Sequence, residues 1–585
     1  MYKGLKLIIG TVCLLMGTTL QAQLDDSQTE FLKPFRAKLA QSQKFEAQPL
    51  LPRLDTNSNK KLNYVVPTHL LGLPYPAPII RPLAMPRGRA TEVYNFYAKA
   101  GFGYPLSPLI ELSYFNDDIE RLKYGAQVRH HSVLQGYLPN QNFTQTGIDV
   151  QVDYFLEKGL VIGGTLDFDF NTNRFYGFDP VIESYAITED SMRQRFLNIG
   201  GNVHLFNGTL NKSAFNYRVD LDVYRYSDAF KSTEVGIAPN VTLEKWFGKG
   251  KQRSAFRLKT GLSYLNFQDI PVEVNNVTTT ATKQLTLIHF NPTFVAKLGA
   301  FKMRLGLNTG LNASASGNGN TNNFYIHPDV EFSYAIASGA FVPYIGAVGQ
   351  VRQNSFRSLT TYNRFLVSNP ALRHTNYLEL FGGLKGSIKK INYDIRGGYA
   401  LTQDLPYFVN DTGALTQFSR FRPVYDTASI IFVKGTVDFR LLDDLVIGGT
   451  AGFHAYNTTN FEKAFHLPTF ESNIFVEYIL SFKGKLREQK GKTISKGKIQ
   501  KTAYNPYLSF RGEFYVNSGV PYLDENQEVG VLQGLYDLNL GVDLHVSDHV
   551  ILFADFNNIL HNRNQRWYQY RQLGFNAMVG AKVRF

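Results

Sequence analysis

The sequence predicts an all-β fold: a transmembrane antiparallel β-barrel of about 22 strands, preceded by a short Pro-rich N-terminal arm. Three observations predict it. Aromatic residues make up 14% of the 585 residues and charged residues only 19%, an unusual balance for a soluble protein. Apolar and polar residues alternate with period two over long runs, as in strands whose two faces meet different surroundings. After residue 23 there is no run of 18 apolar residues, which excludes a bundle of membrane helices.

Residues 1–22 are predicted to be a signal peptide. Lys3 and Lys6 form its basic start, an apolar stretch follows, and the small residue Ala22 precedes a cleavage point before Gln23. Cys13, the single cysteine, lies inside this segment, so we expect an exported chain without disulfides or cysteine-bound metals.

Residues 23–91 are predicted to form a periplasmic arm rather than a full plug domain. Proline is too frequent there for a packed arrangement of helices and strands. The prolines are Pro34, Pro49, Pro52, Pro67, Pro74, Pro76, Pro78, Pro82 and Pro86.

Residues 92–585 are predicted to form the barrel. The last strand is the clearest, with one apolar face: Leu573, Phe575, Ala577, Val579, Ala581, Val583 and Phe585. A soluble β-sandwich would also alternate, but its strands are usually about 5–6 residues long, shorter than these runs. Charged residues on the opposite face would be costly in a dry core and are inexpensive in a wet lumen. These are Asp167, Asp169, Arg218, Asp220 and Asp543.

Short and long connections are predicted to alternate along the chain, as in outer-membrane barrels with short periplasmic turns and long outer loops. The predicted short turns include Glu157 to Gly159, Leu298–Gly299, Ser338–Gly339, Lys389 to Ile391, Asp443–Asp444 and Ser547–Asp548. The predicted long loops include Asn171 to Arg193, Gln268 to Gln284, Asn312 to Asn323, Gln353 to His374, Asp404 to Tyr425, Asn457 to Pro468, and Asn517 to Glu528. Because a lumen this wide would leak, we expect inward-folded loops, the arm or a partner chain to fill it; a connection such as Gln353 to His374 is long enough to cap the mouth.

Near the C-terminus, the run from Phe556 to Arg563, then Tyr568, Tyr570 and the strand ending at Phe585, resembles the last hairpin of TonB-dependent receptor barrels. The resemblance implies a 22-stranded barrel in the cell outer membrane, with Phe585 as the terminal residue that the barrel assembly machinery reads. The segment from Tyr75 to Met85 resembles receptor-type barrels of the Bacteroidota that have no plug.

A basic run between residues 483 and 501 is the one unusual local feature, with a single acidic residue, Glu488. The strand count places it in a long periplasmic connection. We expect either a solvated loop or a contact with anionic lipid or an acidic partner. Its basic residues are Lys483, Lys485, Arg487, Lys490, Lys492, Lys496, Lys498 and Lys501.

No pattern of residues predicts catalysis, a cofactor or a metal site. The adjacent pair His130–His131 would point to opposite faces of a strand and could not share a metal ion. We therefore expect no enzyme and no cofactor. The partners expected are outer-membrane lipid, the barrel assembly machinery and other envelope proteins, and no nucleic acid.

Two functions remain compatible with the sequence. The first is a non-enzymatic structural or accessory subunit of an envelope assembly, suggested by the arm without a plug. The alternative is a receptor-like transporter or passive channel that carries a nutrient across the outer membrane.

Overall fold

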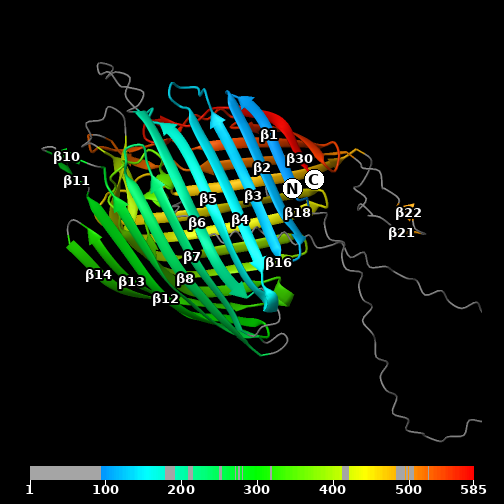
Figure 1. The fold of residues 1–585 in the computed structure, drawn as a ribbon, viewed down its shortest axis with the longest axis horizontal. Helices are drawn as coiled ribbons and strands as arrows, with labels where there is room; N and C mark the ends of the chain where they lie inside the picture. Colours follow the sequence, from blue (N-terminus) through cyan, green and yellow to red (C-terminus); the bar gives the residue numbers. More distant parts are fainter. Residues whose placement is uncertain are drawn as a thin grey trace, which may run out of the picture. The chain divides into compact units, whose positions relative to one another are not determined.

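The computed structural model is a closed antiparallel β-barrel of 22 strands (Figure 1). It describes residues 94–177, 192–207, 215–248, 253–270, 272–274, 277–279, 281–316, 319–411, 420–482, 494–495, 498–499, 506–524 and 526–585. The predicted signal peptide and the predicted Pro-rich arm, residues 1–22 and 23–91, lie outside the described residues.

Each barrel strand pairs with its neighbours along the sequence, and β1 closes the cylinder by pairing with β30. The first half of the wall comprises β1 Phe96–Tyr104, β2 Ser107–Ile119, β3 Leu122–Val133, β4 Phe143–Phe155, β5 Leu160–Arg174, β6 Arg193–Asn207, β7 Phe215–Ser227, β8 Thr233–Phe247, β9 Ser254–Gln268, β12 Thr282–Leu298 and β13 Phe301–Ser316. The second half comprises β14 Gly319–Tyr334, β15 Val342–Gln353, β16 His374–Ile388, β17 Ile391–Asn410, β18 Phe421–Leu442, β19 Leu445–Thr458, β20 Phe470–Ser481, β23 Tyr507–Asn517, β26 Tyr536–His545, β27 Val550–Asn557 and β30 Asn576–Arg584.

Short elements lie in the connections. These are the 3₁₀ turns η1 Glu157–Gly159 and η3 Ala337–Gly339, the helix α3 Phe356–Tyr362, and the small hairpins β10 Val272–Val274 with β11 Val277–Thr279, β21 Ile494–Ser495 with β22 Lys498–Ile499, β24 Pro521–Leu523 with β25 Val529–Val531, and β28 Gln565–Trp567 with β29 Tyr570–Arg571. Within the described residues, no helix is both long enough and apolar enough to cross a membrane.

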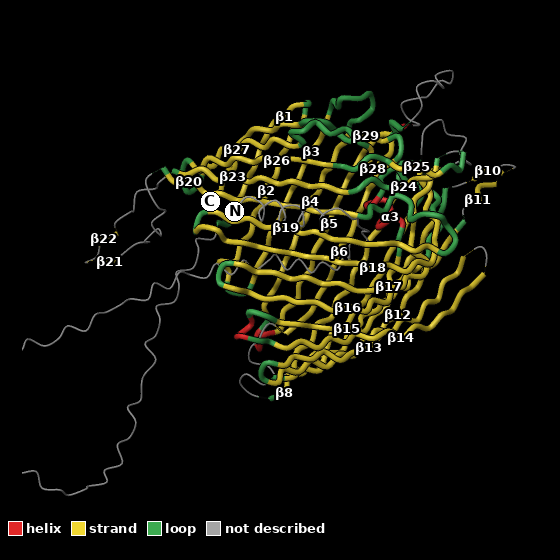
Figure 2. The backbone as a smooth tube through the Cα atoms, turned by 180° about the vertical axis from the view of Figure 1, so that it is seen from behind, coloured by secondary structure: helices red, strands yellow, loops and turns green. Residues whose placement is uncertain are grey.

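The predicted alternation of connections is confirmed. All six predicted short turns join consecutive strands at one end of the barrel, which we call the turn end; β1 begins there and Phe585 pairs with Phe96 there. The other end, the loop end, carries α3 and the hairpins β24–β25 and β28–β29 (Figure 2). Because periplasmic turns are short and outer loops long, the loop end faces the cell exterior.

Two predicted loops were wrong in extent. Strands β13 and β14 continue through most of the segment from Asn312 to Asn323, and their pairing runs to Ser316 and Gly319. Likewise β17 extends to Asn410 and pairs with β18 as far as Phe421. Small polar residues suggested loops there, but the backbone satisfies its hydrogen bonds by prolonging the ladder beyond the membrane.

The outward face of the wall is apolar, as the period-two pattern predicted. Leu166 is 68% exposed, Val203 60%, Ile345 64% and Val579 58%. Side chains this apolar and this exposed form the belt that contacts lipid in an outer-membrane barrel. The protein is therefore located in the cell outer membrane.

Candidate functional site

The connection between β15 and β16, residues 354–373, carries α3 and packs against the inner wall of the barrel at its loop end (Figure 2). Helix α3 begins with a capping box: Ser355 Oγ accepts the N–H of Ser358 at 3.0 Å, and Ser358 Oγ accepts the N–H of Ser355 at 2.9 Å. This arrangement satisfies the first amide groups of a very short helix. We call residues 354–373 the cap.

Glu234 on β8 holds the start of the cap. Its side chain is fully buried and accepts the backbone N–H of Phe356 at 2.6 Å and that of Arg357 at 3.3 Å. The hydroxyl of Tyr224 donates to the same carboxylate at 2.9 Å. Bonds to a charged acceptor are stronger than bonds between neutral groups, so this one residue fixes α3 against the wall.

Aromatic side chains of the wall surround the first turn of α3. Phe356 is fully buried against Phe267 and Tyr226, whose ring centroids lie 5.1 and 5.6 Å away. The hydroxyl of Tyr226 also lies 2.8 Å from Thr360 Oγ1. These contacts join α3 to β7 and β9, strands far from β15 in the order around the barrel.

The second half of the cap packs into a larger apolar group that we call the mouth cluster. Phe365 stacks on Tyr570 at 3.6 Å between centroids, and Phe421 lies 5.4 Å from Trp567. Backbone bonds strengthen the contact, because Phe421 donates to Phe365 O at 3.0 Å and Val367 donates to Phe421 O at 2.8 Å. The cluster's buried members are Phe175, Met192, Leu359, Phe365, Leu366, Phe408, Phe421, Trp567 and Tyr570.

The mouth cluster joins segments from three connections, β5–β6, β15–β16 and β27–β30, with the loop-end parts of β17 and β18. Fully burying a large apolar side chain contributes about 1.5–3 kcal/mol. Nine such side chains therefore hold the outer mouth closed with an apolar core of its own. The connection from Gln353 to His374 thus packs against segments from other parts of the mouth, as expected of a loop that caps it.

Burial in the mouth shifts the pKa values of its ionisable groups. Burial lowers the pKa of His466 to about 3, and its ring lies against Trp567 and Phe421. Burial raises the pKa of Asp228, although hydrogen bonds from the N–H groups of Phe230 and Ser232 and from two side chains oppose this shift. Desolvation raises the pKa of Tyr176 to about 12. All three shifts have the same main cause, the burial of the group among the side chains of the mouth.

Below the cap the inner wall is polar. Arg357 of the cap donates to Asn198 Oδ1 at 3.4 Å, and Asn198 donates to Asp167 at 2.6 Å and to Asp169 at 3.3 Å. Arg129 pairs with Asp149 at 2.8 Å and lies 3.8 Å from Asp169. The contact with the cap identifies this face as the lumen, so the prediction that Asp167 and Asp169 face inward is confirmed.

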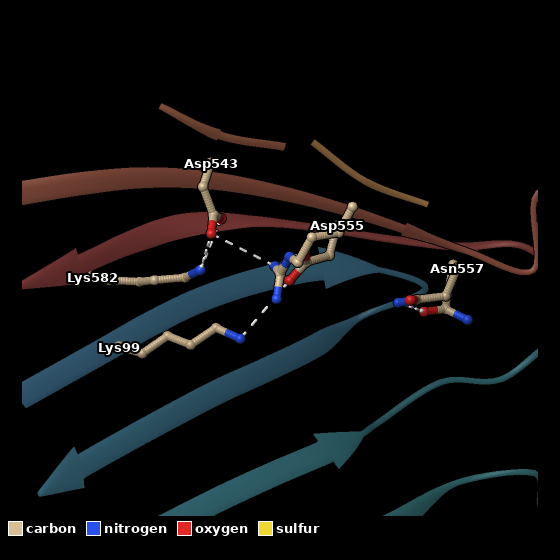
Figure 3. A network of polar contacts seen from close by, with 7 residues as sticks. Lys99, Asp543, Asp555, Asn557 and Lys582 are labelled. Carbon is tan, nitrogen blue, oxygen red and sulfur yellow. Dashed lines mark hydrogen bonds and ion pairs between the residues drawn. The ribbon is translucent and has the colours of Figure 1, made fainter. Parts of the chain in front are cut away.

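A second inner network crosses the seam where the barrel closes (Figure 3). Lys582 Nζ lies 2.7 Å from both oxygens of Asp543, and Lys99 Nζ lies 3.8 Å from Asp555. Arg511 approaches both carboxylates, at 3.7 and 3.4 Å. The network links strands on both sides of the β1–β30 junction and places Asp543 on the lumen face, as predicted.

The sequence-predicted site residues lie elsewhere. Phe585 is 60% exposed at the turn end, beside Phe96 at 6.3 Å and His549 at 5.4 Å between ring centroids. By its position in the sequence, the basic run belongs to the connection from β20 to β23, and its contacts stay a prediction. Only the backbone of Lys498 in β22 is described, and the other basic residues of the run lie outside the described residues.

Sequence reasoning missed Glu234 and Trp567 as parts of the closed mouth. Glu234 had one available signal, an acidic residue at the start of an apolar strand. Trp567 is one of only two tryptophans and follows the receptor-like motif.

Among the residues that the structure describes, no group of three His, Cys, Asp or Glu side chains could hold a metal ion.

Fold and lumen together define the class of protein: a 22-stranded outer-membrane β-barrel whose outer mouth is packed with its own loops. Among solved structures, the chain is similar to the complex of FpvAI with pyocin S2, with a TM-score of 0.60 and 10% identity over 85% of this chain and 74% of that one. It is also similar to the siderophore receptor PiuA from Acinetobacter baumannii, with a TM-score of 0.58 and 9% identity over 85% of this chain and 82% of that one.

The ferric yersiniabactin uptake receptor FyuA from Yersinia pestis aligns with a TM-score of 0.58 and 9% identity, over 85% of this chain and 81% of the receptor. Identities this low establish a shared fold only. No protein-family model matches the sequence, and a sequence search among curated proteins finds no match.

Proposed function

We propose that the protein is a gated, non-enzymatic transport barrel that carries a solute across the outer membrane. The observation that carries this proposal is the cap: a loop of the chain itself, held by Glu234 and the mouth cluster, closes a polar lumen. Natural barrels of 22 strands enclose a lumen wide enough to need a plug or closure.

The form of the closure favours a gate. The cap is held by hydrogen bonds and aromatic contacts, which can break and re-form without covalent change. Beneath it, ion pairs such as Arg129–Asp149 and Lys582–Asp543 make a wall that tolerates water. A barrel that only anchored other envelope proteins would need neither a polar conduit nor a movable closure.

The structural neighbours support the same choice. They are named as siderophore receptors or an uptake receptor, whereas nothing in the comparisons supports a purely structural subunit. We extend to this chain only the general activity, movement of a solute through the barrel. We also retain the proposal that Phe585 is read by the barrel assembly machinery.

The experiment is a permeability test in cells. The cap would be shortened by replacing residues 356–371 with a short Gly-Ser link, and cells would be exposed to an antibiotic too large for ordinary porins. Cells that produce the shortened protein should become sensitive, and cells that produce the wild type at equal surface abundance should not. Equal resistance of both strains would contradict the proposal.

A further inference from the structure

Three exposed arginines lie on the outward face of the barrel near its loop end, and an exposed lysine lies in the connection next to them. They lie on β6, on β7 and in the connection between β7 and β8, strands that adjoin one another in the wall (Figure 1). We call this set the outer-rim basic patch: Arg193, Arg195, Arg225 and Lys231.

Alternation along the strands shows that the arginines point outward. On β6, Gln194 and Phe196 are buried, and Phe196 stacks on Tyr226 of the inner wall at 5.7 Å between centroids. Because successive side chains of a strand point to opposite faces, Arg193 and Arg195 face away from the lumen. On β7 the same rule turns Arg225 outward, since Tyr224 bonds Glu234 of the inner wall and Tyr226 bonds Thr360 of the cap.

The patch lies where the apolar belt ends. Toward the turn end, the outward positions of β6 continue with Ile199 and Val203, which are 52% and 60% exposed. Arg225 pairs directly with Ile199, and Val223 follows it on the outward face of β7. A side chain at this level has its base in the hydrocarbon margin and its charged end in the headgroup layer of the outer leaflet.

The charges of the patch are not neutralised within the described part of the chain. Inner-wall arginines pair with acids, for example Arg129 with Asp149 and Arg218 with Asp220. Among the described residues, no acidic side chain forms an ion pair with any of the four patch residues. Cationic side chains without an acidic partner beside a lipid layer are stabilised by anionic groups of that layer.

We propose that the outer-rim basic patch binds the phosphate groups of a phosphorylated outer-leaflet lipid. Arginine presents paired N–H donors that match phosphate oxygens, and three of the four patch residues are arginine. Arg225 lies directly beside Ile199 of β6. Arg195 is four residues from Ile199 toward the loop end, so Arg195 and Arg225 are roughly 13 Å apart along the strand direction, at about 3.3 Å per residue. Two arginine side chains can together reach one phosphorylated headgroup over that distance. This inference depends on the membrane location and not on the transport proposal.

The test measures lipid binding by the full-length protein in a neutral detergent. The probes are lipid A with its phosphates, the same lipid after phosphatase treatment, and inorganic phosphate alone. The test variant is Arg193→Gln/Arg195→Gln/Arg225→Gln. The matched control, Lys297→Gln/Lys389→Gln/Arg440→Gln, removes three exposed basic residues at the turn end. Heat-modifiable migration on gels reports folding for every protein.

Wild type and control should bind phosphorylated lipid A, with an affinity that falls as salt rises, and should bind the dephosphorylated lipid at least tenfold more weakly. The test variant should bind the phosphorylated lipid at least tenfold more weakly than wild type. If it does not fold, Arg195→Gln and Lys231→Gln alone should each weaken binding several-fold. Equal binding by wild type and the patch variants would overturn the proposal, as would equal binding of the two lipids. Displacement of the lipid by millimolar inorganic phosphate would indicate a free-anion site and would also overturn it.

Discussion

Replacing Glu234 with glutamine should loosen the cap without changing its shape. The native carboxylate accepts two backbone N–H groups of the cap and the hydroxyl of Tyr224. A hydrogen bond to a charged group contributes about 1.5–3 kcal/mol, against about 0.5–1.5 kcal/mol for a neutral one. Glutamine keeps one acceptor oxygen but turns an NH₂ group toward donors, so we expect a net cost of about 2–3 kcal/mol.

That cost raises the population of the open cap by a factor of roughly 30 to 150, because about 1.4 kcal/mol is a tenfold change. Single-channel recording in a planar bilayer should show brief openings far more often in Glu234→Gln than in wild type. Glu244→Gln is the matched control: Glu244 lies on the inner face of the same strand, pairs with Arg257 and does not contact the cap. An opening frequency of Glu234→Gln no higher than that of Glu244→Gln would refute the role of Glu234.

Four further predictions follow from the mouth and the seam. Trp567→Ala should cost the mouth cluster about 3–5 kcal/mol and make the cap cleavable by protease added from outside intact cells. The pKa of His466 is about 3 in the closed mouth and 6.5 ordinarily, so between these pH values the open mouth, in which His466 is exposed, binds more protons than the closed one. The stability of the closed mouth should therefore fall as pH drops below about 6.5, by about 2 kcal/mol at pH 5, and channel openings should become more frequent there in wild type but not in His466→Phe. Asp543→Leu or Lys582→Leu alone should lower the gel-shift unfolding temperature more than the double variant, because each single change takes from a buried charge its closest partner. Deletion of Phe585 should lower the amount of barrel assembled in the membrane, as measured by surface labelling, without altering the unfolding temperature of the barrel that does assemble.

The barrel itself was predictable because a strand between lipid and a wet lumen must alternate. Leu166 and Val579 were assigned to the lipid face and Asp167 to the lumen face from period alone, and the structure places them there. The short turns were equally predictable, since each interrupts the alternation within two or three residues.

From the sequence one could predict that the outer mouth must be closed, but not which contacts close it. The sequence indicates that a wide lumen requires closure and that the connection from Gln353 to His374 is long enough. It does not indicate that Phe356 meets Glu234, because that hydrogen bond joins residues 122 positions apart. Contacts of this kind depend on the order of strands around the barrel, which local periodicity does not encode.

The extents of β17 and β18 were mispredicted for a related reason. Phe408 and Phe421 are buried only because the prolonged hairpin reaches the mouth cluster. Seen from the sequence alone, aromatic residues beyond the belt resemble parts of an exposed loop.

The conductance of the full-length protein in a planar bilayer, with and without the cap, tests most directly whether the cap closes the barrel. We predict that the wild-type barrel is nearly silent and that the barrel with residues 356–371 replaced by a Gly-Ser link conducts in large, stable steps. A shortened barrel that folds and inserts yet stays as silent as the wild type would show that the cap does not close the conduit.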